Sequence, residues 1–175
     1  MNTAKMITQA TLELMKQYPF SEITVTMICQ EADVSRQTFY RKFKDKKEVI
    51  ENYFTQLTQN FTAAFKPSAT DYKDNLKELF NNFPYPPDIL LLLLKNDLFF
   101  VMEKAFAKYA RKTIKELGYG NISERFFDYQ VDFVASTVSS IIRLWIEGGM
   151  KETKDELAEM AIIFFWGTYE FANKK

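Results

Sequence analysis

Residues 34–48 read VSRQTFYRKFKDKKE and carry an unusual local charge. Between Arg36 and Lys47 there are six basic side chains and a single acidic one, Asp45. The whole chain, in contrast, has a formal net charge of zero, with 23 basic and 23 acidic residues. Positive charge concentrated in one stretch of a neutral protein predicts a surface that meets an anion.

Helical periodicity divides this stretch into two faces. On a helix that turns about 100° per residue, Phe39 and Phe43 share one face, which is expected to point into a core. Gln37 and Arg41 lie on the opposite face. Amide and guanidinium groups pair with base edges and phosphates. The stretch therefore predicts a short helix with an outward face suited to nucleic acid.

The residues on either side complete a helix-turn-helix. Thr24 and Ser35 are favourable N-cap residues for two short helices, separated by a turn at Asp33. In a motif of this size, the first residues of the second helix contact base edges. Asp45 is expected to cap a fourth helix, whose N-terminus favours phosphate. The basic charge alone would also fit an exposed helix face whose Lys and Arg side chains contact only water. The spacing of the aromatic residues and the three caps favour DNA binding instead.

The composition favours an all-α fold. Glycine and proline number only five each, and such low turn content favours helices over a many-stranded sheet. Apolar spacing and helix breakers predict a first helix over 3–17 and a fourth from Asp45 to Phe65. Later helices are expected over 71–83, over 88–116 with a break near Asn96, over 123–149 and over 153–172. We expect a helix-turn-helix domain at 1–46 and a helical body at 47–175.

Several classes of function lack support in the sequence. Histidine is absent, Cys29 is the single cysteine, and there is no glycine-rich phosphate loop or nucleophile motif. We therefore expect no enzyme, no metal and no cofactor, and a small buried role for Cys29. The most apolar run, Ile89–Leu94, is too short to cross a membrane, and the N-terminus lacks a signal-peptide pattern. These features predict a cytoplasmic protein.

The segment FSEITVTMICQEADVSRQTFYRKFKDKKEVIENYF, residues 20–54, resembles the N-terminal DNA-binding domain of the TetR family of transcriptional regulators. The resemblance implies a TetR-like fold of about nine helices and a homodimer that binds a palindromic operator in double-stranded DNA. Asp33 stands where the family usually has glycine, and aspartate tolerates a left-handed conformation at small cost. The matching positions are Thr24, Val25, Ile28, Ala32, Val34, Ser35, Thr38, Tyr40, Phe43, Lys46 and Glu48.

The resemblance also implies which residues contact DNA. Thr38, Tyr40 and Lys46 would contact phosphates, and Arg36 and Gln37 would read bases. Gln37 replaces a small residue of the family and can pair with adenine through two hydrogen bonds. The full set of expected DNA-binding residues is Thr24, Thr26, Ser35, Arg36, Gln37, Thr38, Tyr40, Arg41, Lys42 and Lys46.

The last two helices are expected to form a dimer interface. On residues 123–149, large apolar side chains form one stripe, and small serines lie elsewhere on the helix. Residues 161–166, AIIFFW, are apolar all round, so this helix is buried on more than one side. The simplest structure that would bury its second side is another subunit. The alternative is that this helix lies at the centre of a single monomer. The expected interface residues are Phe127, Val131, Val134, Val138, Ile142, Trp145, Met160, Phe164 and Phe165.

The resemblance further implies an effector pocket in the middle helices. Aromatic side chains with few polar groups suggest a small, largely apolar ligand, although the same residues could form plain core. The expected lining is Phe61, Phe65, Phe80, Phe83, Phe100, Met102, Phe106 and Tyr109.

The leading hypothesis is a transcriptional repressor that a ligand releases from DNA. An activator or co-activator of the same fold is the alternative, because residues 143–160 loosely resemble a subgroup that includes regulators of dihydroxyacetone kinase operons. A helical scaffold that binds only protein is a third class, and it predicts no salt-dependent affinity for DNA.

Overall fold

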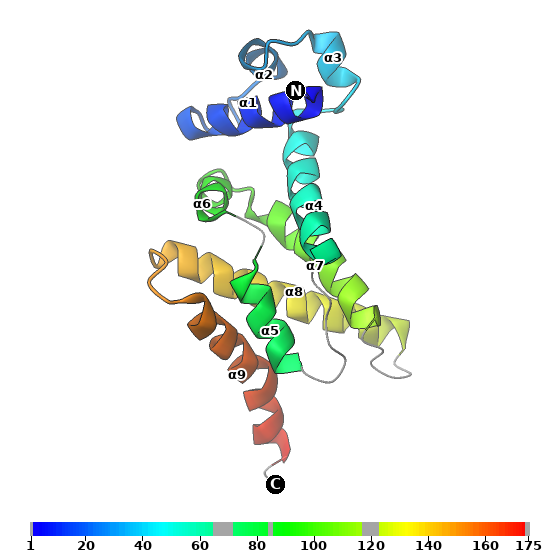
Figure 1. Cartoon of the computed structure of the whole chain (residues 1–175), viewed down its shortest axis with the longest axis vertical. Helices are drawn as coiled ribbons and strands as arrows, with labels where there is room; N and C mark the ends of the chain where they lie inside the picture. The colour runs from blue at the N-terminus through cyan, green and yellow to red at the C-terminus, as the bar shows by residue number, and fades with distance from the viewer. Residues whose placement is uncertain (1, 65–71, 84–85, 117–122, 174–175) are drawn as a thin grey trace. The chain divides into compact units, whose positions relative to one another are not determined.

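The computed structural model is all α-helical over the residues that it describes, which are 2–64, 72–83, 86–116 and 123–173. Side chains are described for all of these except 61–64, 72 and 166–173. The all-α prediction is confirmed, and Figure 1 labels the helices in chain order. Their bounds are α1 Thr3–Gln17, α2 Val25–Glu31, α3 Arg36–Tyr40, α4 Lys46–Ala64, α5 Tyr72–Asn81, α6 Pro87–Lys95, α7 Phe99–Glu116, α8 Glu124–Glu147 and α9 Lys154–Asn173.

The first four helices begin at residues whose side chains cap them. Asn2, Thr24 and Ser35 accept a hydrogen bond from a backbone N–H in the first turn of α1, α2 and α3. The Oδ1 atom of Asp45 accepts the N–H of Glu48 in α4 at 2.8 Å. These N–H groups have no partner within their own helix, so each cap satisfies a polar group and fixes where the helix starts. The caps predicted at Thr24, Ser35 and Asp45 are confirmed.

The turn between α2 and α3 depends on a left-handed residue. Asp33 has a φ angle of 51°, a conformation that Asp and Asn adopt more readily than most other side chains. It allows the N–H of Val34 to reach the carbonyl of Cys29 at 3.0 Å. The prediction that Asp33 maintains this turn is confirmed.

An apolar core holds α1, α2, α3 and the start of α4 together. Ile7, Ile28 and Phe39 come from the first three helices, and each is 0% exposed. Phe43 is also buried, and its ring centroid lies 6.0 Å from that of Phe39. Burial of a side chain of this size contributes about 1.5–3 kcal/mol. The core thereby fixes which face of α3 points outward.

A sharp bend separates α6 from α7. Asn96 ends α6, and Asp97 adopts a left-handed conformation with a φ angle of 55°. The N–H of Leu98 then reaches the carbonyl of Leu93 at 2.9 Å. The break predicted near Asn96 is confirmed.

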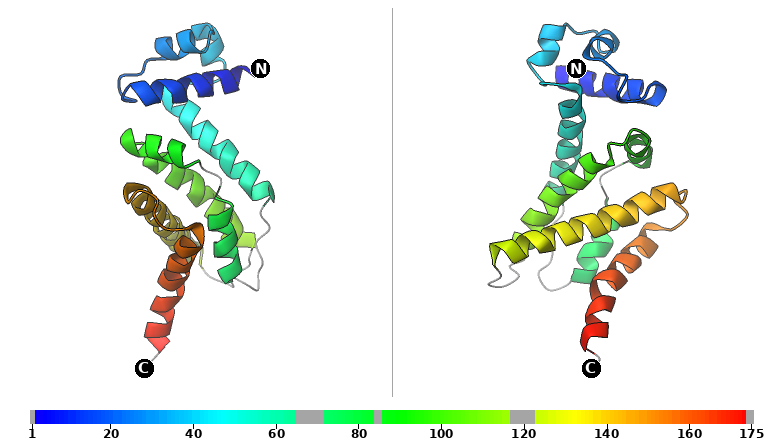
Figure 2. Two further views of the ribbon diagram at one scale, coloured as in Figure 1. Left: turned by 60° about the vertical axis from the view of Figure 1, so that its left-hand side comes forward. Right: turned by 180° about the vertical axis from the view of Figure 1, so that it is seen from behind.

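Helices α8 and α9 are joined by a short turn, as both views in Figure 2 show. The side chain of Ser123 caps α8, and Gly148 ends it. Gly149 has a φ angle of 83°, and the N–H of Met150 reaches the carbonyl of Trp145 at 2.8 Å. A residue without a side chain suits this left-handed position. The limits predicted for both helices are close to those observed.

Helix α5 packs against α9. Leu76 and Leu79 of α5 are both 5% exposed. At the end of α5, the side-chain amide of Asn81 donates to Asp155 at 2.9 Å, and Lys154 donates to the carbonyl of Asn81 at 3.0 Å. These two contacts fix the start of α9 against the end of α5.

Packing divides the chain into two compact units. The first comprises residues 1–57 and 85–105, and the second comprises 58–84 and 106–175. The division falls within α4 and within α7, so each of these helices contributes to both units. The functional boundary between residues 46 and 47 stays a prediction.

Candidate nucleic-acid interface

Helix α3 has one polar, exposed face. Arg36, Gln37 and Arg41 are exposed, whereas Phe39 is buried in the core. Tyr40 is 50% exposed, and its ring meets that of Phe39 edge to face, with the centroids 5.5 Å apart. This contact holds the tyrosine ring at the surface of the unit. The sequence prediction of an inward Phe39 and an outward Gln37 and Arg41 is confirmed.

The basic groups on this face are not neutralised by the protein. Within the described part of the chain, the structure shows no ion pair for Arg36, Arg41 or Lys42. All three side chains are exposed, as is Lys44. Each therefore contributes its charge to the local surface potential, which favours the approach of a phosphate backbone.

Hydroxyl groups flank the basic face. The Ser35 hydroxyl accepts the N–H of Thr38 at 3.1 Å and donates to the Thr38 hydroxyl at 3.0 Å. Thr24 accepts the N–H of Met27 at 3.2 Å, and Thr26 is exposed. A hydroxyl has one donor and two acceptor positions. Thr24 can therefore still donate to a phosphate while it caps α2, and the hydroxyls of Thr26 and Thr38 can donate as well.

Lys46 lies in a different environment from the one predicted. Its ammonium group donates to the backbone carbonyls of Phe20, Ser21 and Ile23 at 2.6, 3.1 and 2.6 Å, and it lies 4.7 Å from the centroid of the Phe20 ring. An ammonium group has three donors, and these contacts use all of them. Burial lowers the pKa of Lys46. Within the protein this side chain ties the start of α4 to the loop between α1 and α2, and the expected phosphate contact stays a prediction.

A second side chain fixes the same loop. The N–H of Phe20 donates to the Oδ1 atom of Asn96 at 2.6 Å, across 76 positions in the sequence. The side-chain amide of Asn96 also donates to the carbonyl of Leu92 at 2.9 Å. Lys46 therefore holds the loop to α4, and Asn96 holds it to the end of α6.

The apolar stripe predicted as a dimer interface faces the interior of the chain. Val131, Val138 and Ile142 are 1%, 0% and 1% exposed. Val131 packs with Ala110 and Ile114 of α7, so the partner of this stripe is the protein's own core. Periodicity shows that a stripe is buried but does not identify what covers it. The other predicted residues are half-buried (Phe127, Val134, Trp145, Met160, Phe165) or exposed (Phe164).

The opposite face of α8 carries apolar side chains that stay more than half exposed among the described residues. Phe126, Tyr129 and Phe133 are 59%, 61% and 55% exposed, and Leu144 is 59% exposed. This face was not predicted from the sequence, although Phe126, Tyr129 and Phe133 recur at spacings of three and four residues, which place them on one side of a helix. It is the better candidate for contact with another protein chain.

The aromatic residues predicted to line an effector pocket are largely buried. Phe80, Met102 and Phe106 are 2%, 0% and 3% exposed, and the ring centroids of Phe106 and Tyr109 are 5.5 Å apart. Burial also raises the pKa of Tyr109, so its hydroxyl stays protonated. Side chains in a solid core and side chains that line an enclosed pocket are both expected to be buried. The effector pocket therefore stays a prediction. Phe83 and Phe100 are half-buried, and the side chains of Phe61 and Phe65 lie outside the described residues.

Two other kinds of site can be assessed from the described residues. Among them, no group of three His, Cys, Asp or Glu side chains is placed to hold a metal ion. Of the helices in the described ranges, none is both long and apolar enough to cross a membrane.

Sequence models of two families match the chain. The one described as "Bacterial regulatory proteins, tetR family" matches residues 7–53, and the one described as "Transcriptional regulator C-terminal region" matches residues 92–166. No curated protein matches the sequence. The first match coincides with the helix-turn-helix built above, and the second covers most of α6 to α9.

Solved structures share the fold over nearly the whole chain. The dihydroxyacetone kinase operon activator DhaS is 20% identical, with a TM-score of 0.59 and 97% of both chains covered. A protein described as a TetR-family transcription regulator from Shewanella sp. PV-4 is 17% identical, with a TM-score of 0.63 and 96% of this chain and 98% of that chain covered. A similarly described protein from Syntrophomonas wolfei str. Goettingen is 14% identical, with a TM-score of 0.60 and coverages of 93% and 92%. At these identities the likeness is one of fold.

Proposed function

The chain belongs to the TetR family of bacterial regulatory proteins, and on this premise we propose that it is a homodimeric repressor of transcription. In this proposal the repressor binds a palindromic operator in the cytoplasm and is released by a small, largely apolar ligand. The observation that carries the proposal is the exposed face of α3, where Arg36, Gln37 and Arg41 have no acidic partner among the described residues.

The positions on this face suggest separate roles. Arg36 and Gln37 occupy the first turn of α3, the part of a recognition helix that meets base edges in the major groove. Arginine pairs best with guanine and glutamine with adenine, and one good pair contributes about 1–3 kcal/mol of discrimination. In this proposal Thr38, Tyr40 and Lys42 contact phosphates, and such contacts position the helix without reading sequence.

A selection from random DNA with the purified full chain tests this proposal. We expect a palindromic site, because the two heads of a dimer read two half-sites. Gln37→Ala should relax the preference at one position of each half-site and leave the salt dependence unchanged. Lys42→Ala should weaken all sequences alike and reduce the slope of log affinity against log salt by about 1.8, because the dimer loses two phosphate contacts at about 0.9 each. If the selection enriches no site, or Gln37→Ala leaves every preference intact, the proposed reading face is incorrect.

Dimerisation is supported by the uncovered face of α8. Phe126, Tyr129 and Phe133 lie on it, and Phe133 also meets Phe165 of α9 edge to face, with the ring centroids 5.6 Å apart. Ile163 of α9 is 62% exposed. Scattered apolar residues are common on protein surfaces, but several on one face of adjacent helices mark a contact site. The proposed dimer therefore pairs α8 and α9 with their copies.

Sedimentation of the full chain tests the dimer. Phe133→Glu places a charge in the proposed interface and should convert the dimer to a monomer at micromolar concentration. Lys108→Glu also introduces a glutamate at an exposed position, on α7, and should leave the dimer intact. A dimer that survives Phe133→Glu would exclude this face.

One buried polar group supports a ligand in the second unit. The hydroxyl of Ser139, which is 4% exposed, has no hydrogen-bond partner among the described residues. Buried polar groups are nearly always paired, so a polar group of a ligand at this position would satisfy it. The ligand releases DNA only if it binds one conformation of the dimer better than the other.

The sign of regulation is tested in cells. Deletion of the gene should raise expression from the selected operator if the protein is a repressor, and lower it if the protein is an activator. The activator remains the second candidate because a protein named as an activator, DhaS, shares the fold.

A further inference from the structure

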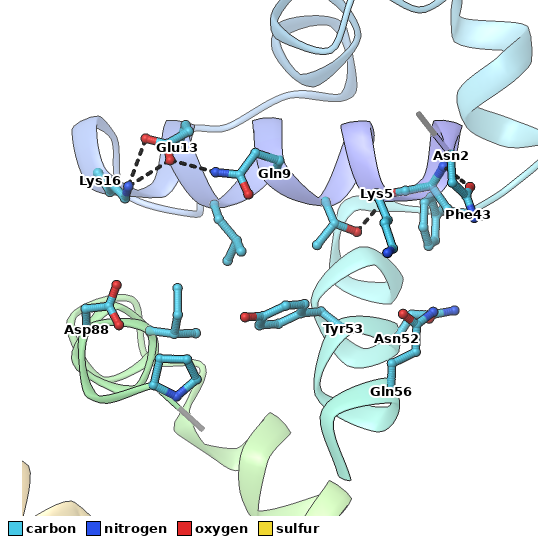
Figure 3. A pocket seen from close by; sticks show the side chains of 15 residues that line it. Asn2, Lys5, Gln9, Glu13, Lys16, Phe43, Asn52, Tyr53, Gln56 and Asp88 are labelled. Atoms are coloured by element: carbon cyan, nitrogen blue, oxygen red, sulfur yellow. Dashed lines mark hydrogen bonds and ion pairs between the residues drawn. The ribbon is translucent and has the colours of Figure 1, made fainter. Parts of the chain in front are cut away.

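The unit that contains the helix-turn-helix has a pocket of about 500 Å³ on the side of α1 that faces α6. Helix α1 forms one wall, α4 a second, and the first turn of α6 a third, as Figure 3 shows. The volume lies within the range of pockets that bind small molecules. All of its lining residues belong to this one unit, and none belongs to the predicted effector pocket.

The middle of the pocket is apolar. Leu12 of α1 and Ile89 of α6 are 5% and 8% exposed and line it from two sides. The ring of Tyr53 also lines the pocket, and Figure 3 shows its hydroxyl directed towards α6. An aliphatic segment of a ligand would be removed from water here, which contributes about 0.8 kcal/mol per buried CH₂ group.

Several polar groups of the lining are already paired. Glu13 accepts hydrogen bonds from Lys16 at 2.8 and 2.9 Å and from Gln9 at 2.9 Å. The side chain of Gln56 donates to that of Asn52 at 2.7 Å. The charges of Glu13 and Lys16 therefore offset each other, and neither is the main charge offered to a ligand.

Two oppositely charged groups that line the pocket have no partner among the described residues. Among the described residues, the structure shows no partner for the ammonium group of Lys5 or for the carboxylate of Asp88, and both residues are exposed. Figure 3 shows Lys5 and Asp88 at opposite ends of the pocket, with Tyr53 between them. Burial, and then the negative charge of Asp88, raise the pKa of Tyr53. The Tyr53 hydroxyl therefore stays protonated and can donate a hydrogen bond.

We propose that this pocket binds a small zwitterion, with an amino group at Asp88, a carboxylate at Lys5 and an apolar chain across Leu12 and Ile89. The carboxylate-bearing end meets a cation, the amino end meets an anion, and the net charge of the four ionised lining groups is zero. A neutral apolar ligand would pair with neither Lys5 nor Asp88, and a ligand with one charged group would pair with only one of them.

Linear ω-amino acids are the probes that test the site, because only their chain length varies. The series runs from glycine through aminobutyrate and aminohexanoate to aminooctanoate, and it is titrated into the full ¹⁵N-labelled chain without DNA. We expect saturable shifts at the backbone amides of Lys5, Thr8, Tyr53 and Ile89, with affinity that rises with length to an optimum. The matched alkyl amine and alkyl carboxylate should each bind more weakly than the zwitterion of the same length.

Two variants assign each end of the ligand. Asp88→Asn should weaken the zwitterion and the alkyl amine about threefold to fivefold and leave the alkyl carboxylate unchanged, since exposed charge pairs are weak. Lys5→Gln should weaken the zwitterion and the carboxylate and spare the amine. Lys151→Gln, an exposed lysine remote in sequence from the lining, controls for net charge. The proposal is overturned if no probe gives saturable shifts at these amides, or if binding is indifferent to both variants.

Discussion

The three carbonyl contacts of Lys46 give the most specific energetic prediction. Lys46→Met keeps most of the length of the side chain and removes the ammonium group, so the carbonyls of Phe20, Ser21 and Ile23 lose their shared donor. The bonds to Phe20 and Ile23 are partly buried, whereas the bond to Ser21 is exposed and can be replaced by water. Only the first two are therefore expected to contribute to the free energy of unfolding.

The magnitude follows from these two bonds. A hydrogen bond to a charged group contributes about 1.5–3 kcal/mol, and the lower value suits partly solvated sites. Two such bonds give about 3 kcal/mol, so Lys46→Met should lower the free energy of unfolding by about 2–3 kcal/mol. Lys47→Met is the matched control. Lys47 meets Glu51 at 3.7 Å on an exposed surface and should contribute less than about 1 kcal/mol.

Two assays separate this role from a DNA contact. Urea unfolding, followed by circular dichroism, measures the loss of stability. Affinity for the selected operator, measured over a range of salt at a temperature where the variant is folded, tests the contact. If Lys46 only positions the loop, the slope of log affinity against log salt is unchanged. A stable variant with a slope reduced by about 1.8 would refute the reasoning, because each of the two Lys46 side chains of the dimer would then neutralise a phosphate.

Three further predictions concern the supports of the fold. Asp33→Ala should lower the free energy of unfolding in urea by about 1 kcal/mol, because alanine tolerates a φ angle of 51° poorly. Asp33→Gly should lower it by less than half of this, because glycine adopts this conformation readily. Equal effects of the two substitutions would contradict a strained turn. Asn96→Ala should cost about 2 kcal/mol for two hydrogen bonds, and its effect should be non-additive with Lys46→Met because both hold the Phe20 loop. Hydrogen bonds from Thr153 lower the pKa of Glu156, so its contribution to stability is present above the ordinary glutamate pKa and is lost as pH falls through the lowered pKa. The stability difference between the wild type and Glu156→Gln, followed by thermal unfolding, should therefore shrink as pH falls through this window, and a difference independent of pH would count against it.

Local signals were enough to predict the helix-turn-helix. Caps at Thr24 and Ser35, the turn at Asp33 and the spacing of Phe39 and Phe43 each depend on a few neighbouring residues. Such signals can be read from the sequence because hydrogen bonds near helix ends join residues only a few positions apart. The same holds for the break near Asn96.

Long-range contacts explain what was missed. Lys46 reaches carbonyls more than 20 positions earlier in the chain, and backbone acceptors leave no mark on the sequence. The stripe of Val131, Val138 and Ile142 was correctly recognised as buried, but its cover is the chain itself. Two apolar faces on one helix, one covered within the chain and one not, cannot be told apart by periodicity alone.

The most direct test of the account compares two duplexes of equal length, the selected operator and a scrambled version, at low and at physiological salt. The account predicts an affinity for the operator about a thousandfold or more above that for the scrambled duplex, with both affinities falling as salt rises. The preference should be lost when Arg36 and Gln37 are both replaced by alanine. Equal affinity of the wild type for the two duplexes would contradict the claim that the outward face of α3 reads DNA sequence.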